Sequence, residues 1–316
     1  MDFLKLVLLF SLFVTLSCSK KIHYEQLIEQ EVPKVGYAIQ NVNIFNGKDS
    51  ILLLNRDVWI EGNKIVKIEE AGKLHSLKAY DIIDGTNKTL MPGLIDAHVH
   101  VSGNGAVPWK QYKANVPYNL QAYLYTGITC VYDLGGLSKK LHKLKLSVEK
   151  GKLPGPQIKH THIPITVKNS HPIPITKEIL PWPLNSLVNQ ISPTISKEND
   201  AKKLVKSYAK MKVDYMKLIV DQMPPGSPEM PYPFIKALVD ESHKKGLKVF
   251  VHVGSPQNAL DAIRAGADVL AHGVWRGKLN DEQAKTIAES GTPIIYTISG
   301  IKNAGEIHKC SFRPND

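Results

Sequence analysis

After Met91 the chain repeatedly alternates a short apolar run with a longer amphipathic stretch, and this alternation limits the possible folds more than any other feature. The apolar runs have the length of strands, and the stretches between them have helical spacing. Strands that alternate with helices lie parallel in one sheet. Seven strands in series therefore predict an α/β fold, a TIM-like (β/α) barrel. We expect these strands at 90–100, 126–134, 157–163, 213–220, 247–252, 268–273 and 293–299.

Local signals bound several of the intervening helices. Ser196 has the residue type of a helix N-cap and is followed by acidic residues, which favour a helix start. Gly246 is placed to end a helix over 233–245, and Ser255 to begin one that runs to Arg264. A further helix is predicted over 281–290. The long, proline-rich segment 170–197 follows the third strand, so we expect it on the catalytic face as a lid or substrate wall.

The first predicted strand ends in two histidines, His98 and His100. Because side chains alternate along a strand, both imidazoles and Asp96 should project from one face. Two histidines in this arrangement can supply two nitrogen ligands to a metal ion. The same spacing also suits two half-buried, hydrogen-bonded histidines, so the pair does not decide between the two interpretations by itself.

The organisation of the whole chain follows from changes in its local pattern. We predict a signal peptide at 1–18, a polar tether at 19–35, a small β module at 36–90, the barrel at 91–299 and a divergent tail at 300–316. In the β module, short alternating runs are separated by Asn46-Gly47 and Gly62-Asn63, which are turn residues of β-hairpins.

The N-terminus predicts export. Residues 6–14 form an apolar core of signal-peptide length, shorter than the roughly 20 residues that a membrane-spanning helix needs. The sequence Ser17-Cys18-Ser19 resembles a bacterial lipoprotein cleavage site, with Cys18 as the lipidated residue. We therefore expect a protein of the bacterial cell envelope that is held at the membrane by a lipid anchor. An ordinary secretory signal that is cut nearby is the alternative.

Composition narrows the function classes. With 43% hydrophobic residues, the 316-residue chain can build a globular core, and its formal net charge is +11. The lysines are scattered over helical stretches such as 139–145 without interleaved aromatic residues, which disfavours nucleic-acid binding. A solvated basic surface, which also suits anionic lipid headgroups, is the better interpretation. Only three cysteines occur, without a CxxC pair, so neither a cysteine metal site nor a disulfide framework is expected, and Cys130 is predicted to be a buried thiol.

Polar residues stand at the ends of four predicted strands. They are His98, His100, Lys217, His252 and His272, and each follows an apolar run. The carboxyl ends of the strands in a (β/α) barrel meet at one rim, where such barrels carry their active sites. One histidine at a strand end is commonly structural, whereas four histidines and a lysine that converge on one rim indicate a metal site.

This set resembles the metal-dependent amidohydrolase superfamily, and most closely its imidazolonepropionase-like and prolidase-like branch. The resemblance covers about residues 37–299 and is carried by the sequences at 91–100, 127–129, 133–136, 213–217 and 266–273. Members of this superfamily pair the barrel with a small β-sandwich, so the resemblance implies that the β module is one.

The resemblance also implies roles for individual residues. His98, His100, His252 and His272 would be metal ligands, and Lys217 would be carbamylated and bridge two divalent ions, for which the histidine-rich ligands favour zinc. A lysine among hydrophobic residues is desolvated, so its pKa falls and the neutral amine can capture carbon dioxide. The alternative for Lys217 is a side chain that extends outward past the strand end.

The expected substrate is a small-molecule amide or a dipeptide-like compound, hydrolysed at a C–N bond by metal-activated water. His171 resembles a family histidine that contacts substrate. His160 and His162 are interpreted as ordinary polar residues of a strand.

The segment 300–316 departs from the family's pattern. We expect the barrel to be incomplete after the seventh strand and to lack the aspartate that ends the family's eighth strand and shuttles the proton, so no catalytic carboxylate is assigned. Three explanations are open: a truncated or frameshifted gene, completion by another chain in an oligomer, or binding without turnover. A non-catalytic, exported metal- or ligand-binding lipoprotein is therefore the alternative to an enzyme.

Overall fold

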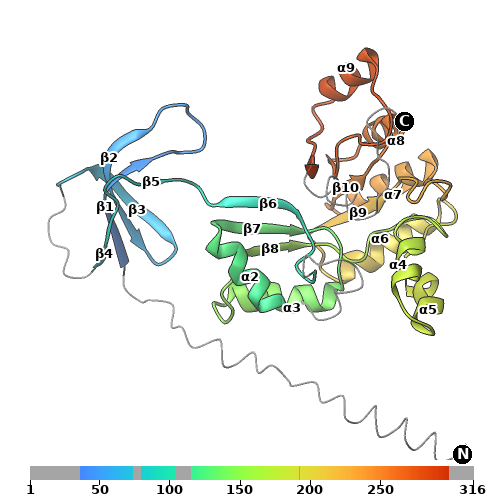
Figure 1. Cartoon of the computed structure of the whole chain (residues 1–316), viewed down its shortest axis with the longest axis horizontal. Coiled ribbons are helices and arrows are strands. Elements are labelled where there is room, and N and C mark those ends of the chain that lie inside the picture. Colours follow the sequence, from blue (N-terminus) through green and yellow to red (C-terminus); the bar gives the residue numbers. More distant parts are fainter. Residues whose placement is uncertain (1–35, 74–79, 104–114, 192, 299–316) are drawn as a thin grey trace, which may run out of the picture.

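The computed structural model of the chain describes residues 36–73, 80–103, 115–191 and 193–298. In these ranges a small β module is followed by a larger α/β body (Figure 1). The predicted signal peptide, the tether, Cys18 and the tail at 300–316 lie outside the described residues. None of the helices within the described ranges is long and apolar enough to cross a membrane.

The β module is one five-stranded sheet. It contains β1 (Gly36–Ile44), β2 (Leu53–Glu61), β3 (Lys64–Glu70), β4 (Tyr80–Asp84) and β5 (Thr89–Leu90). The strand order is β3-β2-β1-β4, and β5 also pairs with β1. The described residues do not form the second, facing sheet of the predicted β-sandwich. Consistent with a single sheet, apolar residues of β3 and β4 such as Ile65 and Ile82 are more than half exposed.

The α/β body contains two parallel three-stranded sheets. One has the order β6-β7-β8, from β6 (Leu94–Val99), β7 (Ile128–Asp133) and β8 (Gln157–His160). The other has the order β11-β10-β9, from β9 (Tyr215–Ile219), β10 (Lys248–His252) and β11 (Val269–Leu270). Parallel bridges from Ile165 to Leu218 and from Leu270 to Ile294 extend this row, so all seven predicted strand positions contribute backbone pairing.

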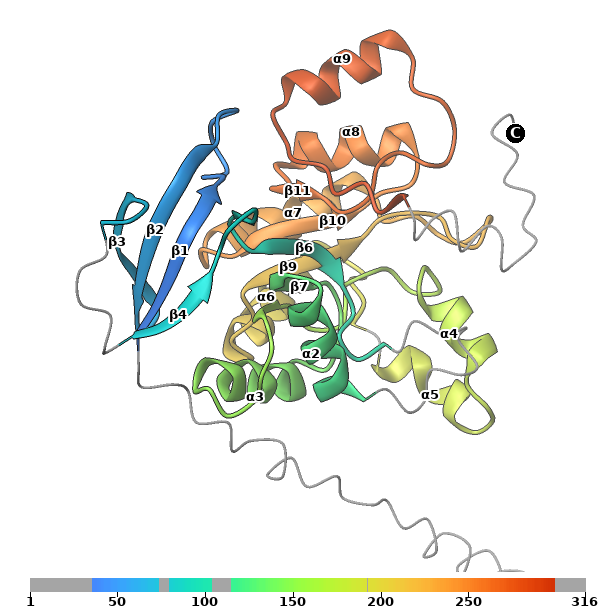
Figure 2. The ribbon, with the colours of Figure 1, turned by 60° about the vertical axis from the view of Figure 1, so that its left-hand side comes forward.

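Helices cover the outer faces of these sheets (Figure 2). They are α2 (Val116–Tyr125), α3 (Ser138–Glu149), α6 (Asp200–Lys210), α7 (Tyr232–His243) and α8 (Pro256–Ala265). The described ranges also contain α4 (Ile173–Ile179), α5 (Leu184–Ile191) and α9 (Asp281–Glu289). Buried residues of α2 and α3 pack against β7 and β8, and those of α6, α7 and α8 pack against β9 and β10. The short helices α4 and α5 lie in the segment between β8 and β9, which was predicted as a lid or wall.

Strand alternation decides which side chains enter the space between the sheets. In β9, Met216 and Leu218 belong to the core under the helices, whereas Tyr215 belongs to a second cluster with Phe250 and Leu134. The rings of Tyr215 and Phe250 lie 4.5 Å apart, and those of Tyr132 and Tyr215 lie 5.7 Å apart. This inner aromatic row joins the two sheets. Lys217 stands two residues after Tyr215 in β9, so its side chain projects from the same strand face, nearer the carboxyl end of the strand.

The described strands do not close into a barrel. β6 and β11 are the outer strands of their sheets, and the predicted seventh strand makes only the bridge at Ile294. The first predicted strand is not buried at its start, where Leu94 and Ile95 are 49% and 63% exposed. Both residues lie on a strand that has only β7 as a partner, so one edge of β6 is uncovered.

Two of the predicted helix signals are confirmed and one is not. The Ser255 side chain accepts a hydrogen bond from the amide of Asn258 in a capping box at the start of α8. Gly246, which follows α7, adopts the left-handed conformation that suits glycine. Ser196 is not the cap of α6. The helix begins at Asp200, whose carboxylate accepts hydrogen bonds from the amides of Ser196 and Lys197.

Candidate metal centre

A pocket of about 470 Å³ opens at the carboxyl ends of the strands. It is lined both by polar side chains and by a set of apolar side chains, here called the apolar wall. The polar residues are His98, His100, His171, Lys217, His252 and His272. The apolar side chains are Leu134, Leu137, Ile163, Pro164, Pro172 and Ile219, and the glycines Gly135 and Gly136 complete the lining.

The predicted histidines converge although they come from both sheets. The ring of His98 lies 4.6 Å from that of His272 and 5.7 Å from that of His100, measured between ring centroids. His252 lies 4.3 Å from His272 and 5.1 Å from His171. Because β6 and β11 are distant in the sequence, only the curvature of the strand row brings His98 and His272 into contact.

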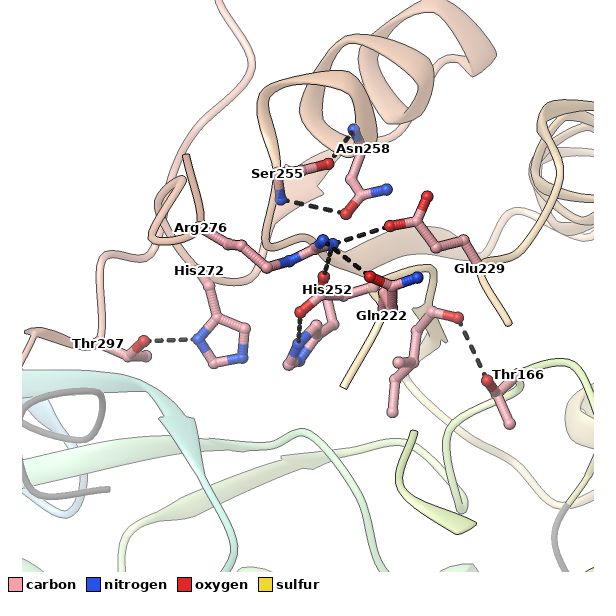
Figure 3. Close-up of polar contacts among 11 residues, drawn as sticks. Thr166, Gln222, Glu229, His252, Ser255, Asn258, His272, Arg276 and Thr297 are labelled. Atoms are coloured by element: carbon pink, nitrogen blue, oxygen red, sulfur yellow. Dashed lines mark hydrogen bonds and ion pairs between the residues drawn. The ribbon is translucent and has the colours of Figure 1, made fainter. Parts of the chain in front are cut away.

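Hydrogen bonds leave one free nitrogen on each of two of these rings, those of His100 and His272, and Figure 3 draws the contact of His272 with Thr297. His100 Nδ1 lies 3.1 Å from the carbonyl oxygen of Gly135, and a carbonyl only accepts, so Nδ1 carries the proton and Nε2 is free. His272 Nδ1 is engaged by the hydroxyl of Thr297 at 2.6 Å, which likewise leaves Nε2. In metal-binding histidines, a hydrogen bond to the ring nitrogen that does not bind the metal orients the ring in this way.

Lys217 is 2% exposed, and its Nζ has no hydrogen-bond partner among the described residues. Burial lowers its pKa well below the usual value for lysine, because an ammonium ion without a counter-charge is poorly solvated there. The side chain lines the pocket and does not extend outward past the strand end. A neutral buried amine is the form that reacts with carbon dioxide.

The histidines around Lys217 are held neutral. Burial lowers the pKa of His98, of His252 and of His272 far below the usual value for histidine, and neighbouring Lys217 and the other rings lower it further. The pKa of His171 falls to about 4, again chiefly through burial. Neutral imidazoles offer the lone pairs that metal ions require.

Asp133 lies outside the pocket lining but fixes two segments that contribute to it. This buried carboxylate accepts hydrogen bonds from the amide of Val101 at 2.9 Å and from that of Gly135 at 3.0 Å. It therefore joins the segments that follow β6 and β7, which carry His100 and the carbonyl that orients it. Burial raises the pKa of Asp133 in spite of these bonds.

The remaining histidines of the third strand region lie outside the pocket lining. His160 is buried near His142 of α3, with 5.9 Å between the ring centroids, and His162 accepts a hydrogen bond from the amide of Ser138. Cys130 was predicted to be buried but is half-buried, near the side chain of Gln157. Cys310 lies outside the described residues.

The donor chemistry of the pocket fits a divalent metal ion. Buried nitrogens without hydrogen-bond partners include His98 Nδ1 and His171 Nδ1, besides the amine of Lys217. Within the described ranges, no three histidine, cysteine or carboxylate side chains already stand as a ready ligand set. The pocket therefore presents the right residue types, which would have to draw together around an ion.

Two polar residues next to the pocket were missed by the sequence analysis. Asp221 is completely buried directly after β9, and Arg276 binds it from the segment after β11. A signal for Asp221 was present, because it is the fourth residue after Lys217 and so shares its face in an extended chain. For Arg276 no local pattern pointed to the site.

Known proteins share parts of this sequence. The model of the amidohydrolase family matches residues 89–310. The 5'-deoxyadenosine deaminase of Methanocaldococcus jannaschii is 46% identical over 63 residues, which are 20% of this chain and 13% of that protein. Adenine deaminase 2 of Shouchella clausii is 33% identical over 74 residues, 23% of this chain and 13% of that protein. The matched segments are thus a small part of these relatives' length.

Solved structures resemble the fold over most of the chain. A Xaa-Pro dipeptidase with methionine bound in its active site has a TM-score of 0.71 at 23% identity, and the match covers 87% of this chain and 70% of that one. A prolidase complexed with N-methylphosphonate-L-proline has a TM-score of 0.67 at 23% identity, covering 83% and 66%. Ochratoxinase of A. niger has a TM-score of 0.67 at 17% identity, covering 85% and 66%. With the family model matching more than half of its residues, the chain belongs to the amidohydrolase family.

Proposed function

We propose that the protein is a metal-dependent hydrolase that cleaves a C–N bond in a small amide or dipeptide-like substrate. The observation that carries this proposal is the convergence of His98, His100, His252 and His272 around the buried Lys217 in one pocket. Separate strands contribute these residues, and a purely structural role would not leave buried nitrogens of His98 and Lys217 without partners.

The residues have distinct parts in this proposal. The four histidines would hold the metal ions, and Lys217, as its carbamate, would supply an anionic ligand between them. Divalent ions held there would activate water and polarise the substrate carbonyl. His171 lies beside His252 and would donate to or accept from the substrate, and the apolar wall would pack against its hydrocarbon part.

The substrate class draws on the neighbouring structures. The prolidase and the Xaa-Pro dipeptidase were solved with an amino-acid-like ligand, and each resembles this chain in fold. An amide with one apolar side would meet both parts of the pocket, because its carbonyl would face the histidines while its hydrocarbon group contacts residues such as Leu137 and Pro164.

Metal content measured together with hydrolysis tests the proposal. We expect the purified chain to retain about two zinc ions and to hydrolyse members of a panel of dipeptides and neutral amides. His100→Asn should abolish hydrolysis and lower the zinc content, whereas His142→Asn, outside the pocket lining, should leave both unchanged. Zinc binding without hydrolysis of any panel member would favour the non-catalytic alternative, and absence of bound metal in a folded chain would overturn the proposal.

We further propose that the chain is exported and tethered to the bacterial cell envelope through Cys18. This rests on the apolar segment 6–14 and on the small residue before the cysteine. The expressed chain should partition into the detergent phase with a lipid-modified N-terminal cysteine by mass spectrometry, and Cys18→Ser should move it to the aqueous phase. An unmodified Cys18 in the mature protein would contradict the anchor.

A further inference from the structure

Asp221 has no exposed surface and faces two basic groups. Its Oδ1 accepts a hydrogen bond from Arg276 Nη2 at 2.6 Å. Its Oδ2 lies 3.5 Å from His252 Nε2 and has no hydrogen-bond partner in the described part of the chain. A buried carboxylate is costly unless its charge is compensated, so these neighbours explain how Asp221 is tolerated.

The backbone leaves space for this carboxylate. Gly254 follows β10 by two residues, and a Cβ atom at this position would lie 2.3 Å from both oxygens of Asp221. The carbonyl of the same glycine accepts hydrogen bonds from the amides of Trp275 and Arg276, at 3.0 and 2.9 Å. The segment after β10 therefore passes closely over Asp221 and also positions the arginine that binds it.

Arg276 connects the segments that follow β9, β10 and β11. Its guanidinium binds Glu229 at 2.8 Å and Gln222 at 3.3 Å in addition to Asp221 (Figure 3). Glu229 and Gln222 both belong to the segment after β9. The guanidinium of Arg276 is planar and has several fixed partners. It therefore restricts the position of the Asp221 carboxylate, so that Oδ2 stays directed at His252.

We propose that Asp221 is a positioning residue that holds His252 in the tautomer with the proton on Nε2, so that Nδ1 is presented to the pocket. At 3.5 Å the two atoms do not form a hydrogen bond, but a negative carboxylate attracts an N–H group and repels a lone pair, so it favours the proton on the ring nitrogen that faces it. Nδ1 then has the lone pair in the neutral ring. The link to a metal ion rests on the proposed function, whereas the tautomer is a property of the metal-free protein.

The imidazole tautomer can be read directly from the full metal-free chain. Nitrogen-15 NMR distinguishes protonated from unprotonated ring nitrogens, and the signals of His252 among the 12 histidines are assigned by their loss in His252→Gln. We expect the wild type to show the Nε2–H tautomer. A wild type with the proton on Nδ1 would overturn the proposal whatever the variants do.

Two variants of the same arginine network separate positioning from general structural support. Asp221→Asn should shift His252 to a mixture of tautomers and weaken zinc binding in a chelator competition by about 10-fold or more. Glu229→Gln changes a partly exposed partner of Arg276 that does not contact His252, so both readouts should remain as in the wild type. Equal effects of the two variants would contradict a specific role of Asp221.

The two proposals can fail separately. If the wild type binds no zinc but its His252 shows the Nε2–H tautomer that Asp221→Asn disturbs, the positioning stands and the metal-dependent function falls. If zinc binds and the His252 tautomer is unchanged by Asp221→Asn, the metal site stands and the positioning falls. Should Asp221→Asn not fold, Arg276→Gln removes the arginine that fixes the Asp221 carboxylate, and it should also weaken zinc binding in the chelator competition.

Discussion

At the scale of single residues, the pocket is notable for buried polar atoms that have no partner. Native proteins pair most buried polar groups, since an unpaired one costs roughly 1–3 kcal/mol. Here the unpaired atoms include Lys217 Nζ and nitrogens of His98, His171 and His252, all of which line one pocket. Their concentration at one place indicates that stability is given up there for binding.

Replacing Lys217 with methionine should separate stability from metal binding. Methionine has a similar length and no polar atom, so Lys217→Met removes a buried amine that lacks a partner. We expect the free energy of unfolding of the metal-free protein to rise by roughly 1 kcal/mol in urea titrations, while the bound zinc falls below about one ion per chain.

Lys145 provides the matched control for this substitution. Its amine lies 2.5 Å from Asp214 in a partly buried ion pair, so Lys145→Met should lower the free energy of unfolding and leave the zinc content unchanged. A Lys217→Met protein that is less stable than the wild type would show that the amine has a partner which the described residues do not reveal.

At the scale of elements, the ends of helices and strands place the pocket residues. The tight approach of β6 to β7 depends on Gly93, since a Cβ atom there would lie 2.1 Å from the Thr129 hydroxyl oxygen. The two glycine-containing motifs at 91–100 and 127–129 are therefore packing partners. This approach sets the position of β6 and thus of the histidines at its end.

Helix capping predicts a difference between two asparagines. Asn280 caps α9, where its side chain accepts a hydrogen bond from the amide of Gln283 in a capping box. Asn199 stands before α6 and makes no such bond. Asn280→Ala should lower the free energy of unfolding by about 1 kcal/mol, and Asn199→Ala should change it by less than about 0.5 kcal/mol, both measured by urea denaturation. Equal losses would mean that the capping bond does not determine the stability of α9.

At the scale of the whole molecule, the buried histidines link stability to pH. Burial lowers the pKa of His171 to about 4, whereas the unfolded chain has the usual value near 6.5. As the pH falls, the unfolded state takes up the proton first. The contribution of neutral, buried His171 to the free energy of unfolding is therefore complete above about pH 6.5 and declines as the pH falls towards 4.

The pH dependence can be tested on the metal-free protein with His171→Gln. Between about pH 6.5 and 4 the wild type should lose stability more steeply than the variant, by up to about 1.4 kcal/mol per pH unit for this one group. Above pH 7 the two slopes should agree, because His171 is neutral in both states there. Parallel curves over the whole range would show that His171 is not shielded from solvent as described.

Much of the fold follows from local pattern. Apolar runs at strand length marked all seven positions of the strand row, and Ser255 marked the start of α8. Ser196 misled the prediction, because Asp200 satisfies the amides before α6 with its own carboxylate. The second sheet of a sandwich was expected by resemblance, and the described residues of the β module supply only one.

The sequence by itself determined the residue types at the strand ends and, through strand alternation, the face from which Lys217 and His252 project. These are local properties, since the period of a strand does not depend on its surroundings. The tertiary structure alone decided that His98 meets His272, that Gly135 and Thr297 occupy one nitrogen of their histidines, and that Arg276 reaches Asp221. Such contacts join residues that are distant in the chain, and they depend on the curvature of the strand row and on the paths of its loops.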